Sequence, residues 1–232
     1  MTGHRGIALI LALLVTSFLS AVGLGLAVMV FMDRLATGNV RGSVALLHAA
    51  DAGLELAAHT LDRADWGEVL AGREQASFSD GSPSGVRGIP GGGEVNLTAE
   101  TNTLNCGQAT ACSDAQMDAN SDERPWGPNN PRWRLYAYGP LDHLAAIARP
   151  TPCYLAVWVA DDSRERDGDP LADGAEAGHG VLRVRAGTYG PLGSRRAVEA
   201  ELARVCFPVA GEEWCQPGFR VQSWQEVRQL VP

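Results

Sequence analysis

The sequence has no lysine, no proline before Pro83 and no charged residue between Arg5 and Asp33. Because proline breaks helices, its absence leaves the first eighty or so residues free to form a long helix. All 19 basic residues are arginine, and the formal net charge at pH 7 is −8. A chain this acidic lacks the basic face with which proteins bind nucleic acid, so we expect no nucleic-acid partner.

The sequence also lacks the common catalytic motifs. There is no Gly-x-Ser-x-Gly, no His-Glu-x-x-His and no Walker loop, and the run Gly91–Gly93 has no following Gly-Lys-Ser/Thr. No Cys-x-x-Cys pair is present, and the histidines lie away from the cysteines, which argues against a zinc site. We therefore expect that the protein is not an enzyme and has no cofactor, apart from the calcium considered below as an alternative.

An uncharged apolar run extends from Ile7 to Met32. It holds 26 residues, whereas about 20 are enough for a helix to cross roughly 30 Å of hydrocarbon. A secretory signal peptide is the alternative, but its apolar core is only about 7–15 residues long. We predict a membrane-spanning helix over residues 7–32, with Arg5 favouring a cytoplasmic amino terminus.

Helical periodicity continues beyond the apolar run, over residues 33–62. Small residues recur there every three or four positions, as on one face of a helix. They allow another backbone to approach closely. The neighbour is either a helix of another subunit or the chain's own globular domain, and the two alternatives are compatible. The residues of this small-residue stripe are Gly38, Gly42, Ala45, Ala49, Ala52 and Gly53.

The amino-terminal region resembles type IV prepilins. The short basic leader 1–6 precedes Ile-Ala-Leu-Ile-Leu-Ala-Leu-Leu-Val (7–15), and the segment 33–61 contains Arg-Leu-Ala-Thr-Gly-Asn (34–39) and Ala-Ala-Asp-Ala-Gly-Leu-Glu (49–55). These blocks are similar to those of the PilX type of minor pilin. The resemblance covers residues 1–62. It implies cleavage of the leader after Gly6 by a prepilin peptidase and N-methylation of Ile7.

The resemblance also implies where the protein acts and what it contacts. Its domain is expected in the periplasm, anchored in the bacterial inner membrane, with major and minor pilins, the pilus assembly platform and a tip adhesin as partners. Major pilins have a glutamate at the fifth mature position, where this chain has Leu11. A K-type pseudopilin of type II secretion shares this departure and is one alternative. A single-pass anchored periplasmic binding domain is the other.

The remaining residues predict a connector and one β-rich domain. Residues 63–94 contain Gly-Ser-Pro and Gly-Gly-Gly clusters with little to bury, which indicates a flexible connector. Residues 95–232 are expected to form the globular domain. Alternation predicts a strand over 94–101, and 106–132 is expected to be a polar loop. Five further strands are predicted as an antiparallel sheet under the helix, giving an α+β, pilin-like fold: 133–138, 153–160, 180–187, 196–205 and 218–224.

Five cysteines outside the membrane span indicate an oxidising compartment. We favour the pairs Cys106–Cys112 and Cys206–Cys215, because each closes a short polar loop, and Cys153 is then left over. Pairing of Cys153 with Cys206, which leaves Cys215 free, remains the alternative.

An acidic segment near residue 165 is the one candidate metal site. Asp161, Asp162, Asp167 and Asp169 lie around Gly168, and calcium takes six to eight oxygen ligands. The spacing does not match an EF-hand loop, and Arg164 and Arg166 partly neutralise the carboxylates. A solvated acidic loop is therefore the favoured interpretation, with calcium as the alternative.

Overall fold

The computed structural model describes residues 4–119, 132–144, 152–162, 169, 171, 180–209, 212–216 and 218–227. The chain divides into two compact units, Met1–Val44 and Ala45–Pro232, which are treated separately here. Helix α1 (His4–Leu61) contributes to both units.

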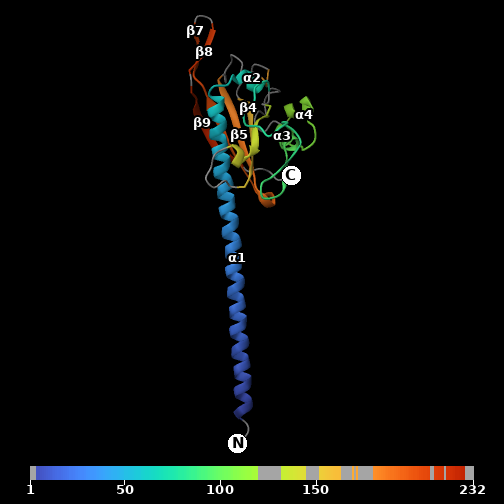
Figure 1. Ribbon diagram of the computed structural model, residues 1–232, viewed down its shortest axis with the longest axis vertical. Helices are drawn as coiled ribbons and strands as arrows, with labels where there is room; N and C mark the ends of the chain where they lie inside the picture. Colours follow the sequence, from blue (N-terminus) through green and yellow to red (C-terminus); the bar gives the residue numbers. More distant parts are fainter. Residues whose placement is uncertain are drawn as a thin grey trace. The chain divides into compact units, whose positions relative to one another are not determined.

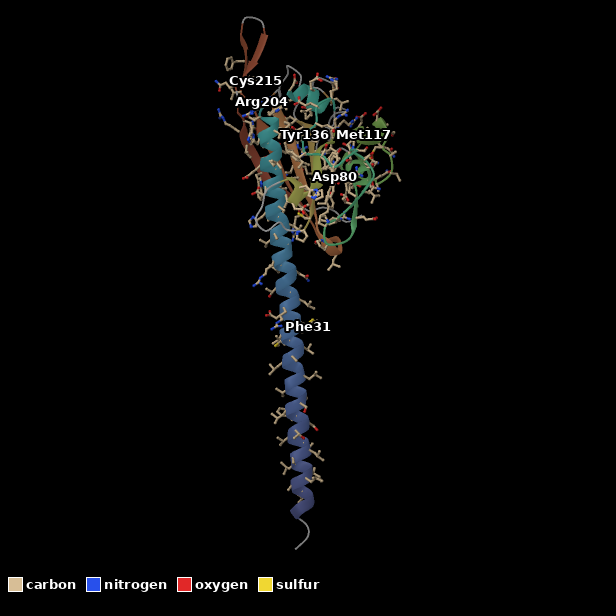
Figure 2. The ribbon with its side chains drawn as sticks, viewed as in Figure 1. Phe31, Asp80, Met117, Tyr136, Arg204 and Cys215 are labelled. Carbon is tan, nitrogen blue, oxygen red and sulfur yellow. A yellow bond between two sulfur atoms is a disulfide. The ribbon has the colours of Figure 1, made fainter. Side chains whose placement is uncertain are left out.

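In the first unit, every described side chain from Ile7 to Gly42 is exposed, although most of those before Asp33 are apolar. The polar groups in the apolar run are satisfied inside the helix, since Thr16 Oγ1 donates to Ala12 O (3.0 Å) and Ser20 Oγ donates to Thr16 O (2.8 Å). Figure 2 shows the apolar side chains, including that of Phe31, projecting from the ribbon. By length and composition α1 is a helix that suits a membrane anchor or a signal sequence.

The second unit is built on an antiparallel sheet of five strands in the order β3-β4-β5-β6-β9. The strands are β3 (Arg134–Pro140), β4 (Tyr154–Asp161), β5 (Val181–Tyr189), β6 (Arg195–Ala203) and β9 (Arg220–Val227). The protein is therefore α+β, with a long apolar amino-terminal helix and an antiparallel sheet, as the sequence predicts. This arrangement is consistent with a pilin-like layout.

One face of the sheet packs against the last turns of α1. Leu46, Ala50, Leu54, Ala57 and Leu61 are buried there, none more than 4% exposed. They meet apolar side chains that alternate along the strands, among them Leu155, Val157, Val184, Ala186, Val198 and Ala200.

The opposite face holds an aromatic cluster around Tyr138, Tyr154, Trp158 and Tyr189. Helix α3 (Leu97–Cys106) and the ribbon of β1 (Val86–Gly88) and β2 (Glu94–Asn96) contribute apolar side chains to the same cluster. Figure 1 shows the last turns of α1 and helix α3 on opposite sides of the strands. All eight residues of β4 are buried, as predicted for a central strand that is apolar on both faces.

The predicted strand over 94–101 is wrong beyond Asn96. Asn96 Oδ1 accepts a hydrogen bond from Ala99 N at 3.1 Å and so caps the amino end of α3, while Gly107, in the left-handed conformation, caps its carboxyl end. The alternating Val95, Leu97 and Ala99 therefore run from a strand into a helix. The loop predicted over 106–132 likewise contains the short helix α4 (Asp114–Ala119), and Cys106 belongs to α3.

The segment 63–94 does bury side chains, contrary to expectation. Helix α2 (Trp66–Leu70) buries Trp66, Val69 and Leu70, and its amino end is capped by Asp65 Oδ1, which accepts from Glu68 N (3.2 Å). A single turn of helix is too short for its periodicity to stand out in sequence. The turn η1 (Pro191–Gly193) joins β5 to β6. Helix α5 (Leu141–Leu144) and the hairpin of β7 (Cys206–Val209) and β8 (Glu212–Cys215) were also not predicted.

Candidate assembly surface of the long helix

The structure divides the small-residue stripe between two surroundings. Ala49 is 5% exposed and belongs to the core that α1 forms with the sheet. Gly53 is buried, Ala45 is half-buried and Ala52 is exposed. Gly38 and Gly42, in the first unit, are exposed. The stripe therefore does not form one contact surface, because only Ala49 and Gly53 turn fully into the chain's own domain.

Gly53 allows the closest approach of α1 to the sheet. A Cβ atom at this position would lie 2.4 Å from Leu155 Cδ1 and 2.7 Å from Leu155 Cδ2. Leu155 is fully buried near the start of β4, so its side chain has little room to move. A glycine is thus required here by packing against the chain's own sheet.

Two side-chain hydrogen bonds, from different strands, also attach α1 to the sheet. Thr188 Oγ1, on β5, donates to Leu46 O at 2.9 Å in a buried position. Trp224 Nε1, on the edge strand β9, donates to Asp51 Oδ1 at 3.0 Å near the surface. These bonds fix the rotation of α1, and hence determine which of its faces remain exposed.

The carboxyl end of α1 is capped by Arg204, the residue that follows β6. Its guanidinium donates to Leu61 O and, at 3.0 Å, to Ala64 O, and Trp66 Nε1 also donates to Leu61 O (2.9 Å). The same guanidinium carbon lies 4.1 Å from the centre of the Trp66 ring. A cation here adds a charged donor to the last carbonyl of α1 and complements the helix dipole.

The structure contains the disulfides Cys106–Cys112 and Cys206–Cys215, which are the pairs favoured from the sequence. The second disulfide joins the ends of the β7–β8 hairpin, which extends past the end of the five-stranded sheet in Figure 1. Figure 2 shows Arg204 close to Cys215, at the base of this hairpin. The capped end of α1 and the hairpin are therefore built on the same short stretch of chain.

Cys153 is a free cysteine, 1% exposed, at the start of β4. Burial, with a smaller contribution from the Asp142 carboxylate, raises the pKa of its thiol to about 11. The thiol is therefore protonated at neutral pH and is a poor nucleophile. Its location in the core indicates a packing role.

The structure describes three of the four predicted calcium ligands, Asp161, Asp162 and Asp169. Asp161 and Asp162 are 1% and 3% exposed at the end of β4, and Asp161 Oδ1 accepts from Asp162 N at 2.8 Å. Asp169 Oδ1 accepts from Leu171 N at 3.0 Å, and Asp167 lies outside the described residues. Among the residues that the structure describes, no group of three or more metal-ligating side chains is found. The expectation that Asp161 and Asp162 belong to a solvated loop is wrong, because both are buried.

A buried ionic cluster on the sheet was not predicted. Glu199 Oε1 and Oε2 accept from Arg183 and Arg185 respectively, the latter at 3.2 Å, and all three residues are at most 9% exposed. Arg183 also lies 5.1 Å from the ring centre of Trp133. In the sequence, the alternating arginines of β5 and the glutamate of β6 indicate such a cluster. A solvated face of the sheet, however, gives the same pattern of charged residues.

The predicted processing site lies at the start of α1. Gly6 and Ile7 are both helical, and the Ile7 side chain is 59% exposed, while residues 1–3 lie outside the described part. Cleavage and methylation there remain predictions.

Comparison of the chain with family models, with curated proteins and with solved structures finds no match. What the fold and this surface define is a class of architecture: a long apolar amino-terminal helix whose last turns form the core of an antiparallel-sheet domain.

Proposed function

We propose that the protein is a minor pilin that inserts in the inner membrane and primes assembly, or caps the tip, of a type IV pilus. The observation that carries the proposal is the double use of α1. Its first part is uncharged and apolar over 7–32, and its last turns form the core of the sheet domain. A simple anchor needs only the first of these features. A filament subunit needs both, because its domain must be fixed to the helix through which it assembles.

The exposed part of the stripe supports assembly through the helix. Gly38 and Gly42 are exposed, and as glycines they lower helix stability by about 1 kcal/mol each relative to alanine. The chain's own sheet requires Gly53 but gives no such reason for these two. Close packing against a neighbouring helix provides the reason.

Leu11 supports a position at the tip. By resemblance, the glutamate of a shaft pilin pairs with the charged amino terminus of its neighbour inside an apolar bundle. An unpaired charge there costs several kcal/mol. Leucine cannot supply the partner, so a subunit with Leu11 fits best where no such pairing is needed. The same argument applies to a tip pseudopilin of type II secretion, which remains the second candidate.

The assembly role is tested by substituting Gly42 with leucine in cells that produce the filament. Bulk at a close helix contact forces the two backbones apart, so we expect Gly42→Leu to be inserted in the membrane but lost from sheared filaments. Ala36→Leu is the matched control, because Ala36 is also exposed and lies about 120° round the helix from Gly42 and about 160° from Gly38. Equal incorporation of the two variants would contradict the proposed use of this surface.

The tip position is tested by immunogold labelling of intact filaments. We expect label at filament ends only, and fewer filaments of unchanged length when the gene is deleted. Label spread along the shaft would contradict the role assigned to Leu11.

A further inference from the structure

The junction between β2 and α3 carries the sequence of an N-glycosylation acceptor. Asn96-Leu97-Thr98 has the form Asn-x-Ser/Thr without a central proline, and it is the only such tripeptide in the chain. In exported proteins this tripeptide marks an asparagine to which a sugar is attached. The two disulfides of the second unit indicate that it folds in an oxidising compartment outside the cytoplasm, where such attachment takes place.

The fold places the two polar side chains of this tripeptide on the surface. Asn96 and Thr98 are exposed, whereas Leu97 is fully buried in the aromatic cluster. The buried leucine fixes the position of the tripeptide, so its neighbours on either side remain in water. A bulky, hydrophilic sugar needs a surface position of this kind, because it cannot be accommodated in a packed core.

The side-chain amide of Asn96 makes its structural bond with oxygen and not with nitrogen. Its Oδ1 accepts from Ala99 N at 3.1 Å and so caps α3. Among the residues that the structure describes, none accepts a hydrogen bond from Asn96 Nδ2. A sugar on Nδ2 leaves the carbonyl oxygen in place, so a glycosylated asparagine still caps the helix. The modification therefore removes no bond that holds the fold.

Asn96 also lies away from the helix that we propose for assembly. Val95 and Leu97, its two neighbours, belong to the aromatic cluster on one face of the sheet, and the last turns of α1 pack on the other face. A sugar at Asn96 is therefore attached to the layer of the second unit that lies across the sheet from α1. Contacts made through α1 are compatible with it.

We propose that Asn96 is N-glycosylated by a membrane-bound transferase that uses an oligosaccharide carried on a polyprenyl pyrophosphate. The reaction joins Asn96 Nδ2 to the anomeric carbon of the sugar and breaks the bond between that carbon and the phosphate oxygen of the carrier. Nδ2 loses one proton, the polyprenyl pyrophosphate leaves, and nothing is oxidised or reduced. The modification requires only that the second unit lie outside the cytoplasm, so it goes beyond the assembly role.

The test is mass spectrometry of the full chain extracted from the membranes of its own cells, both intact and as peptides. We expect the peptide that contains Asn96 to be heavier than its sequence by one or more sugar residues, with fragment ions that place the added mass on Asn96. Asn96→Asp removes the acceptor nitrogen but keeps a capping oxygen. The added mass should therefore disappear, while the melting temperature of the variant stays the same or rises. An unmodified Asn96 in the wild-type chain, or a sugar that persists in Asn96→Asp, would overturn the inference.

Two substitutions at Thr98 show whether the tripeptide directs the modification. Thr98→Ser preserves the acceptor sequence and should keep the sugar. Thr98→Ala leaves Asn96 in place but destroys the sequence, so the fraction of modified chains should fall by about tenfold or more. Equal modification of the two variants would contradict a sequence-directed transferase.

A comparison of two cell fractions tests the placement of the sugar away from α1. Sheared filaments should contain modified chain in the same proportion as the membrane does. A tenfold depletion of modified chain from filaments would contradict this placement. If the wild-type protein enters no filament at all, the proposed function fails, whereas a sugar found on Asn96 still confirms this inference.

Discussion

Replacement of Gly53 by alanine tests whether α1 is fixed to the sheet by close packing at this point. In an exposed helix the change would stabilise the fold by about 1 kcal/mol, because alanine has the higher helix propensity. Here the new methyl group would lie 2.4 Å from Leu155 Cδ1, and the leucine is fully buried. Overpacking of a filled core costs about 1–3 kcal/mol. We therefore expect a net destabilisation of about 1 kcal/mol.

The assay is urea unfolding of the full chain in detergent, with tryptophan fluorescence as the signal that reports unfolding. Ala52→Gly is the internal calibration, since Ala52 is the exposed neighbour of Gly53 and its substitution reports the local helix propensity alone. Leu155→Ala should remove most of the penalty of Gly53→Ala, so the double mutant should show a coupling energy of about 1–2 kcal/mol. If Gly53→Ala is instead more stable than wild type by the amount that Ala52→Gly loses, the close contact does not exist.

Three further predictions concern the second unit. Arg204→Ala should lower the free energy of unfolding by about 2 kcal/mol, since bonds from a charged donor to the end of α1 are lost, and Arg204→Lys should recover only part of it; equal stability of all three forms would contradict the cap. Glu199→Gln should cost about 3 kcal/mol or more in the same urea assay, because two buried arginines lose their counter-charge, and a loss below 1 kcal/mol would show that other groups neutralise them. The pKa of the Cys153 thiol is raised to about 11 in the folded state, so the unfolded chain loses this proton at a lower pH than the folded chain does. The contribution of the protonated thiol to the free energy of unfolding is therefore complete below pH 9 and is lost as the pH rises towards about 11. The stability difference between wild type and Cys153→Ala, measured from pH 7 to 11, should accordingly be constant up to pH 9 and then fall, and a difference that does not vary with pH would contradict the burial of this thiol.

The architecture was predictable because its signals are long. The uncharged run before Asp33 and the two-faced apolar pattern of β4 each extend over enough residues to identify a helix and a buried central strand. Short elements were not predictable. In Val95-Asn96-Leu97 the alternation of a strand merges with the cap of α3, and only the bond from Ala99 N to the Asn96 side chain reveals the boundary.

The surface of α1 was predictable in composition, but not in which of its residues the sheet covers. Gly38, Gly42 and Gly53 lie within about 60° of one another round the helix, yet only Gly53 meets the sheet, because the sequence does not show at which residue of α1 the contact with the sheet begins. The prediction that Asp161 lies in a solvated acidic loop was wrong for a related reason. Asp161 reads as part of a polar loop, but its pairing with Leu182 on β5 places it inside the sheet, where it is buried.

The amino-terminal residue of the protein extracted from membranes tests the central claim most directly. Mass spectrometry of the intact chain and of its amino-terminal peptide should show a mature protein that begins at N-methylated Ile7. Gly6→Leu, which places bulk at the cleavage site, should leave the leader attached. A wild-type chain that still begins at Met1, in cells whose prepilin peptidase is active on other subunits, would contradict the assignment as a pilin.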